Sequence, residues 1–200
     1  MKRRVFTIGH SSQEFSSFQK LLQQHGVTAV VDVRSAPYSR RYPHFSREPL
    51  EKALREAGIA YVFLGKELGA RSDDPASYEN GSVKYERLAK TEVFQSGLDR
   101  VERGLQTFTL ALMCAEKEPL HCHRSILVSR EVEKRGIKVE HILADGSLEE
   151  HSETEKRLLQ MLHLEEANLF RSREEIIADA YTQWGDRIAY TREEEDGQAQ

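Results

Sequence analysis

The two cysteines of the chain lie in one short segment, together with acidic, imidazole and guanidinium side chains: Cys114, Glu116, Cys122, His123 and Arg124. Cys122 comes directly before a histidine and an arginine, at the expected start of a helix. These surroundings lower the pKa of a thiol and favour the thiolate, which is both a nucleophile and a metal ligand. Glu116 is a candidate acid or base if burial raises its pKa. The segment therefore predicts a functional site, either catalytic or metal-binding.

Known thiol-enzyme loops do not fit this segment. Loops of tyrosine phosphatases and of rhodanese-type sulfurtransferases place an arginine at a fixed short distance after the nucleophilic cysteine. Counting back from Arg124 by those distances reaches Glu118 and Pro119. Because neither position carries a thiol, both active-site assignments are rejected.

A metal site is the alternative. Cys114, Cys122 and His123 are ligand types for zinc or iron, and His10 or His121 could add a fourth. The sequence has no Cys-x-x-Cys pair, and the spacing of the two cysteines is not a standard zinc spacing. Ligand type alone supports this reading. His10 is also a candidate general base, with a hydrogen-bonded structural role as its alternative.

Arginines and serines predict phosphate binding. Guanidinium forks, hydroxyl groups and helix N-termini all suit phosphate oxygens. Tyr38, Tyr42 and Phe45 lie among the arginines and could stack on a base. The alternative is a solvated loop whose arginines pair with surface carboxylates. The candidate phosphate-binding residues are Ser11, Arg34, Ser35, Ser39, Arg40, Arg124 and Ser125.

Strands must position these residues. Apolar runs predict strands at residues 5–9, 29–33, 61–64, 108–113 and 138–143, and helical patterns lie between and after them, at 11–25, 46–57, 83–104, 122–134 and 149–162. This alternation predicts an α/β fold of three layers, with a mostly parallel sheet of about five strands and helices on both faces. Ligands bind outside the carboxyl ends of such strands, where the candidate residues would meet.

The chain divides into three parts. We expect an α/β domain at residues 1–164, a C-terminal helical extension at 165–192 and an acidic disordered tail at 193–200. Residues 11–14 and 172–175 read as capping boxes that begin helices. Residues 65–82 lack periodicity and predict a functional loop.

Composition limits the class of protein. The net charge is −4 over 200 residues, which argues against extensive contact with duplex nucleic acid. Two cysteines form no disulfide framework, so we expect a reducing, cytoplasmic location. No apolar stretch approaches the length of a membrane span, and no membrane association is expected.

Four ordered motifs resemble one known family. They are Thr-Ile-Gly-His-Ser at residues 7–11, Val-Asp-Val-Arg-Ser at 31–35 followed by Pro37 and Ser39-Arg40, Leu-Gly-Lys-Glu-Leu-Gly at 64–69, and Leu-Met-Cys-Ala-Glu at 112–116 with Cys-His-Arg-Ser at 122–125. Together they are similar to the bacterial and archaeal family called domain of unknown function 488, over about residues 4–145. The resemblance implies an α/β fold. Its members are sometimes labelled DNA-repair proteins, and the family has no established reaction.

Three functions remain open. The first is an enzyme acting on a phosphate-bearing substrate, a nucleotide or a short single-stranded nucleic acid. Its catalytic candidates are His10, Cys114, Glu116, Cys122 and His123. The second is a zinc or iron protein that uses Cys114, Cys122 and His123, and otherwise no cofactor is expected. The third is a non-catalytic module that binds a ligand or a partner.

Overall fold

A six-stranded sheet forms the centre of the molecule in the computed structural model, which describes residues 3–167 and 169–192. Its strand order is β3-β2-β6-β1-β7-β8. The strands are β1 (Arg4–Gly9), β2 (Ala29–Asp32), β3 (Ala60–Phe63), β6 (Leu110–Cys114), β7 (Lys138–Ile142) and β8 (Leu148–Glu150). The first five are parallel, as the sequence predicted. The short antiparallel β8, paired with β7, was missed.

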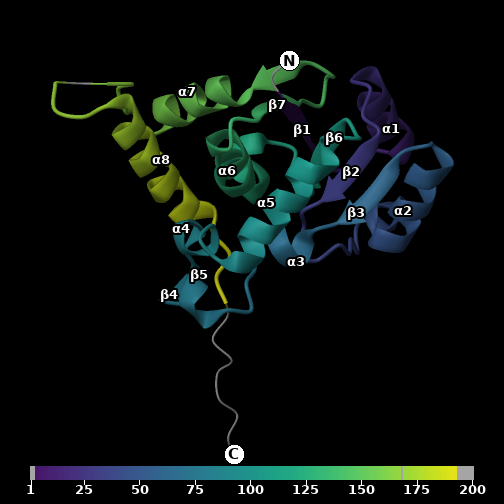
Figure 1. The fold of residues 1–200 in the computed structure, drawn as a ribbon, viewed down its shortest axis with the longest axis horizontal. Helices are drawn as coiled ribbons and strands as arrows, with labels where there is room; N and C mark the ends of the chain where they lie inside the picture. The colour runs from purple at the N-terminus through teal and green to yellow at the C-terminus, as the bar shows by residue number, and fades with distance from the viewer. Residues whose placement is uncertain (1–2, 168, 193–200) are drawn as a thin grey trace, which may run out of the picture.

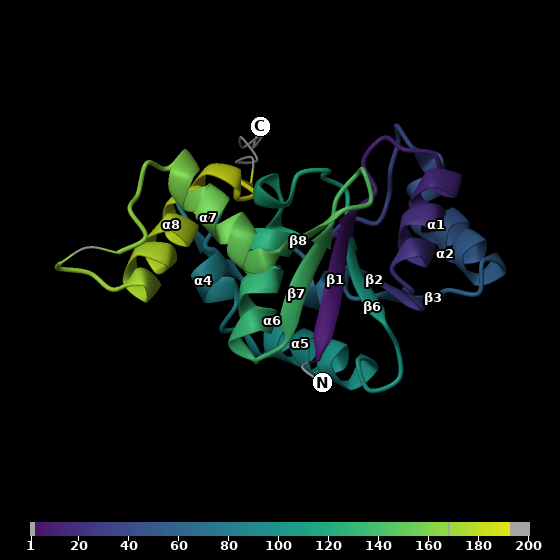
Figure 2. The ribbon, with the colours of Figure 1, turned by 90° about the horizontal axis from the view of Figure 1, so that it is seen from above.

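Helices cover both faces of the sheet, which confirms the predicted three-layer α/β fold (Figure 2). Helices α1 (Phe15–Gln24) and α2 (Arg47–Glu56) pack on one face, where Phe6 and Ile8 meet Phe18 and Leu50. The other face carries α3 (Gly65–Leu68), α5 (Glu92–Gly104) and α6 (Arg130–Lys134). The central strands are apolar runs because both of their faces are buried.

The C-terminal part packs onto the same body. Helix α7 (His151–Met161) and helix α8 (Arg173–Ile188) share a core with Leu120 and Ile126. Helix α8 begins with the predicted capping box of Ser172 and Glu175. The chain then runs beside α4 (Tyr85–Leu88) and the hairpin of β4 (Tyr78–Glu79) and β5 (Ser82–Val83) (Figure 1). The predicted acidic tail at 193–200 lies outside the described residues.

Two local predictions are wrong. No capping box forms at residues 11–14, because Ser11 has a φ of 50° and Glu14 is the N-cap of α1, without a side-chain cap bond. Residues 65–82 are not a single loop, since they contain α3, the 3₁₀ turn η2 (Pro75–Ser77) and β4. The β4–β5 turn is Asn80-Gly81, both with positive φ, a hairpin signal that the sequence reading overlooked.

The segment after Cys122 also differs from the single helix predicted at 122–134. It begins as a π-helix, η4 (Arg124–Ser129), and continues as α6. The Ser129 hydroxyl donates to the Arg124 carbonyl at 2.7 Å and helps to satisfy it within this wider turn. π-helical turns are rare and occur often at functional sites. Two further 3₁₀ turns are η1 (Pro43–Phe45) and η3 (Pro119–His121).

Within the residues that the structure describes, every helix is too short or too polar to span a membrane.

Candidate functional site

The candidate residues converge where β1, β2 and β6 end. Because β6 lies between the other two strands, Cys114 at its end stands between His10 after β1 and Arg34 after β2. The His10 amide donates to the Cys114 carbonyl at 2.9 Å. The loop after β6 then returns Cys122 and His123 to the same point through the turn η3.

Four side chains form one cluster: Cys114, Glu116, Cys122 and His123. Their donor atoms are close, since both sulfurs lie near the same Glu116 Oε2, Cys114 Sγ at 3.0 Å and Cys122 Sγ at 2.9 Å. Cys114 Sγ is 3.7 Å from His123 Nδ1. The two sulfurs and a ring nitrogen of His123 all lie within 4.8 Å of one another. Both cysteines are buried.

Backbone contacts fix the ligand atoms of this cluster. His123 Nε2 is 3.0 Å from the Val33 carbonyl, which can only accept, so Nε2 carries a proton and Nδ1 faces Cys114. Metal-bound histidines generally donate their second ring N–H in this way. The Arg124 amide donates to Cys122 Sγ at 3.4 Å, a contact that favours a thiolate.

The electrostatics of the cluster are uneven. Burial acts to raise the pKa of Cys122, but the hydrogen bond from Cys114 and the positive charge of Arg124 lower it below the ordinary thiol value. Burial and the neighbouring Cys122 raise the pKa of Cys114. Burial and the Cys122 charge also raise the pKa of Glu116. Burial acts to lower the pKa of His123, but its hydrogen bond with Cys122 and the charges of Cys122 and Glu116 raise it.

Arg124 holds the loop of the cluster rather than facing a ligand. Its side chain is fully buried, and its guanidinium donates to the carbonyls of Glu116 at 2.6 Å and Lys117 at 3.1 Å. Gly9 allows the same loop to approach β1, because a Cβ at Gly9 would lie 1.9 Å from the Glu116 carbonyl oxygen. Because it is fully buried against these carbonyls, the Arg124 guanidinium is not exposed for the phosphate contact predicted for it.

A second buried group lies beside the cluster and is internally matched. Asp32 accepts from Arg34 Nε at 2.9 Å, from Arg34 Nη2 at 2.6 Å and from Tyr61 at 2.8 Å. Arg34 Nη1 donates to His10 Nε2 at 3.1 Å, and His10 Nδ1 donates to the Ser11 carbonyl at 2.9 Å. Burial and the Arg34 charge lower the pKa of His10 to about 4. With both ring nitrogens engaged, His10 is held as a neutral structural residue in this arrangement.

A pocket of about 300 Å³ opens onto the cluster. Cys114, Glu116 and His123 contribute to its lining, and so does Arg34. Only three of the five N–H groups of Arg34 have partners within the described chain, so two remain for a ligand. The lining also includes His121, which the sequence analysis named as a possible fourth metal ligand. Further lining residues are Arg71, Tyr85, Ile188 and Tyr190.

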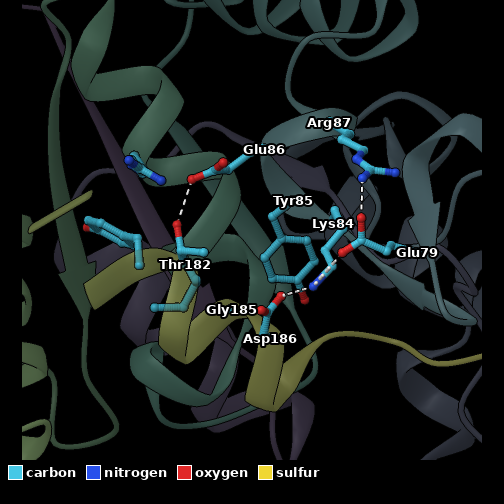
Figure 3. A pocket seen from close by; sticks show the side chains of 11 residues that line it. Glu79, Lys84, Tyr85, Glu86, Arg87, Thr182, Gly185 and Asp186 are labelled. Carbon is cyan, nitrogen blue, oxygen red and sulfur yellow. Dashed lines mark hydrogen bonds and ion pairs between the residues drawn. The ribbon is translucent and has the colours of Figure 1, made fainter. Parts of the chain in front are cut away.

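Another cavity, of about 350 Å³, lies between α4 and α8 and serves as a comparison. Several of its charged groups are paired with one another. Lys84 contacts both Glu79 and Asp186, and Arg87 pairs with Glu79 (Figure 3). Arg130 also lines this cavity and lies over the Tyr181 ring, so the cavity is only partly matched in charge.

One family model matches the chain, over residues 14–130, with the description "domain of unknown function DUF488". The match covers more than half of the chain. The protein belongs to the DUF488 family. This confirms the resemblance that the ordered motifs indicated. No curated protein and no solved structure matches the chain.

The DUF488 region contains all four cluster residues but only part of the pocket. Arg34 and Arg71 lie within residues 14–130, whereas Ile188 and Tyr190 come from the segment after the match. Arg71 lies over the Tyr190 ring, 4.2 Å from its centroid. No sequence pattern linked position 190 to the cysteines, because helix α8 alone brings it there.

The remaining predicted phosphate ligands are scattered. Ser35 lines the pocket, but its hydroxyl accepts from the Arg71 amide at 3.0 Å. Ser39 accepts from the Tyr42 amide, and Arg40 is exposed on the same loop away from the pocket lining. Ser11 borders a different cavity beside β1 and β7. Ser125 is fully buried, and its hydroxyl has no hydrogen-bond partner among the described residues.

Proposed function

We propose that this DUF488 protein is a metal-dependent enzyme that hydrolyses a small anionic substrate. Cys114, Cys122 and His123 would hold one zinc or iron(II) ion, and Glu116 would move protons beside it. The observation that carries the proposal is the convergence of three buried ligand atoms within 4.8 Å, beside a pocket that Cys114 and His123 line. Two cysteines and one histidine are a ligand set of catalytic zinc sites, which keep a fourth position open for water.

The spacing of the ligand atoms supports the proposal. A tetrahedral zinc ion places a sulfur and a nitrogen ligand about 3.5 Å apart, and two sulfurs about 3.8 Å apart. The separation of 3.7 Å between Cys114 Sγ and His123 Nδ1 is close to this value. The Cys122 thiolate and the Val33 carbonyl on His123 supply the charge and the outer contact that such a site needs.

Glu116 suits proton transfer. Its Oε2 lies about equally far from both sulfurs, next to any ion that they bind. A bound metal lowers the pKa of its water toward neutrality. Glu116 would accept a proton from the attacking water as its oxygen bonds to the substrate and the bond to the leaving group breaks. The leaving group would then receive the proton from Glu116. The same pairing of a Cys₂His zinc site with a nearby glutamate acid–base group serves zinc deaminases.

The pocket favours an anion. Arg34 and Arg71 line it, and the Arg71 side chain has no acidic partner within the described chain. A guanidinium group binds phosphate or carboxylate through two parallel hydrogen bonds. The volume of about 300 Å³ suits a nucleotide-sized molecule better than an extended strand. A phosphorylated metabolite or a mononucleotide is thus the substrate class of choice.

Thiol catalysis is the rival function, and the lowered pKa of Cys122 favours it. Access counts against it, because Cys122 is 2% exposed and lies outside the lining of the pocket. Cys114 does line the pocket, but burial and its neighbours raise its pKa and keep it protonated. Metal binding uses both sulfurs without requiring either to reach a substrate.

Elemental analysis tests the metal site. Protein purified without a chelator or a histidine tag is expected to hold about one zinc or iron ion per chain, or to bind one on titration. His123→Gln should lose the ion, whereas His121→Gln keeps it, because His121 belongs to the same loop but not to the ligand group. Folded wild-type protein that binds neither metal would overturn the proposal and favour the thiol reading.

Hydrolysis is tested with loaded protein. Release of phosphate or of a phenol from phosphate mono- and diesters should depend on the metal and fall by about 10²-fold in Glu116→Gln. Arg71→Ala should raise KM while kcat changes little, since it removes a binding contact remote from the metal. Equal activity of metal-free and loaded protein would contradict the reaction.

A further inference from the structure

A continuous line of buried polar side chains connects the cluster with helix α8. Five successive contacts join a guanidinium group of the DUF488 region to a carboxylate on α7. In order, the residues are Arg124, Thr7, His141, His151, Tyr181 and Glu155. The four between the ends are at most 3% exposed. The carboxylate end is 17% exposed and lies 3.6 Å from Arg173.

The contacts are short enough to be hydrogen bonds throughout. Thr7 Oγ1 is 2.7 Å from His141 Nδ1, and His141 Nε2 is 2.9 Å from His151 Nδ1. His151 Nε2 is 2.8 Å from the Tyr181 hydroxyl, which donates to Glu155 at 3.2 Å. Arg124 Nε donates to Thr7 Oγ1 at 3.4 Å. Each middle group therefore takes one proton and gives one.

The ends of the line determine its direction. An arginine can only donate and a carboxylate can only accept, so protons are donated from Arg124 toward Glu155. Thr7 must then donate to His141 Nδ1, and each histidine must carry its proton on Nε2. The opposite order fails at both ends. It would make Thr7 accept twice with no acceptor found for its own proton, and it would leave Glu155 without the Tyr181 donor.

The two histidines are neutral in this line. Burial lowers the pKa of His151 to about 4, and burial with the neighbouring His151 lowers the pKa of His141. A neutral ring has one donor and one acceptor, which is what a one-way line requires.

We infer that Tyr181 of helix α8 is a positioning residue for the cluster, acting through this one-way hydrogen-bond line on Arg124. Arg124 clamps the Glu116 and Lys117 carbonyls, so its orientation sets the Glu116 carboxylate against the sulfurs. Helix α8 lies outside residues 14–130 and thereby completes the site of the DUF488 region from outside it. The effect on a bound metal rests on the proposed function, whereas the line itself does not.

Nitrogen NMR of the histidine rings tests the line without any metal. In wild-type protein at pH 7.5, both His141 and His151 are expected to be protonated on Nε2 alone. Tyr181→Phe removes the acceptor of His151, and the two rings should then show mixed protonation. Thr182→Val is the matched control on the same helix, because it breaks a bond to Glu86 outside the line. Protonation of either ring on Nδ1 in wild-type protein would overturn the inference.

Two measurements on the cysteine cluster test whether Tyr181 positions it. In metal-free protein, Tyr181→Phe should change the reaction rate of the thiols with a disulfide reagent, whereas Thr182→Val should not. In cobalt-loaded protein, Tyr181→Phe should shift the thiolate-to-cobalt absorption band and weaken cobalt binding by up to about tenfold. Thr7→Val cuts the line next to Arg124 and should act in the same direction, so it replaces Tyr181→Phe if that variant is unfolded.

The outcomes separate the two proposals. Wild-type protein without metal, but with the expected ring protonation and thiol response, supports the line and defeats the metal site. Metal binding with thiol rates and cobalt spectra unchanged in both variants defeats the positioning role alone.

Discussion

Two polar groups lie side by side at the same edge of the sheet, and they differ in how their charges and hydrogen bonds are paired. In the Asp32 group, the carboxylate accepts from Arg34 and Tyr61. Arg34 also donates to His10, and His10 donates to the Ser11 carbonyl. In the cysteine cluster, both sulfurs turn toward one oxygen of Glu116. The first group is matched in charge and in hydrogen bonds, whereas the second directs two thiols at one carboxylate oxygen.

The difference separates structure from function. A buried charge with its partner stabilises a fold only modestly, but removing one partner is costly. An unmatched group is kept at a cost and needs another reason, such as binding a cation or reacting. Cys114, Cys122 and Glu116 bring three acidic groups to one point beside His123, which is an arrangement that a metal ion would complete by replacing the thiol protons.

The largest expected change in the free energy of unfolding comes from a substitution in the Asp32 group. Asp32→Ala leaves the Arg34 charge buried without its carboxylate and should lower the free energy of unfolding by about 3–5 kcal/mol. Urea denaturation in the presence of a chelator measures it. The comparison variant is Cys122→Ala, which removes a small thiol and should cost about 1 kcal/mol. Equal losses in the two variants would mean that the cysteines are as structural as Asp32.

The line through His141 and His151 belongs to the matched type, and pH should reveal it. The pKa of His151 is about 4 in the folded protein and 6.5 in the ordinary ring. Between those values the unfolded chain binds more protons, so stability falls as pH drops from 6.5 toward 4. The loss from His151 alone is about 3 kcal/mol, and above pH 6.5 it contributes no slope.

Urea denaturation of metal-free protein from pH 8 to pH 4 measures this loss. His151→Gln removes the titrating ring, so the stability of the variant should fall less steeply than that of wild-type protein below pH 6.5, although the variant is less stable at neutral pH. Parallel curves for the two proteins across that range would show that His151 is already protonated when folded.

The sequence predicted the sheet and the place of the site more successfully than the contacts within it. Apolar runs identify strands because a parallel strand is buried on both faces, and parallel order then brings residues 10, 34 and 114 to one edge. The position of β6 between β1 and β2 could not be predicted from the sequence, because it depends on which helices pack on each face of the sheet.

Side-chain direction could not be predicted either. Arg124 was expected to bind phosphate, but its guanidinium turns inward to two carbonyls of its own loop. That choice follows from the close approach at Gly9 and from the contact with Thr7, both distant in sequence. Tyr190 reaches the pocket only because α8 packs beside η4, a tertiary contact without a local signal.

The smallest expected change in stability comes from Glu116→Gln, and it distinguishes the cysteine cluster from the Asp32 group. Glu116→Gln should change the free energy of unfolding of metal-free protein by less than about 0.5 kcal/mol at pH 8, because the residue is exposed on its outer side, where water screens its charge, although its Oε2 contacts the sulfurs. The sign should be stabilising. Burial at the sulfurs and the Cys122 charge raise the pKa of Glu116, so its ionised form is disfavoured in the folded state above the unfolded pKa. Glu118→Gln, two residues further along the loop, loses an ion pair with Arg157 and should be destabilising by a similar amount. A loss above 1 kcal/mol in Glu116→Gln would place Glu116 with Asp32 as a structural carboxylate, and the unmatched cluster would lose its claim to chemistry.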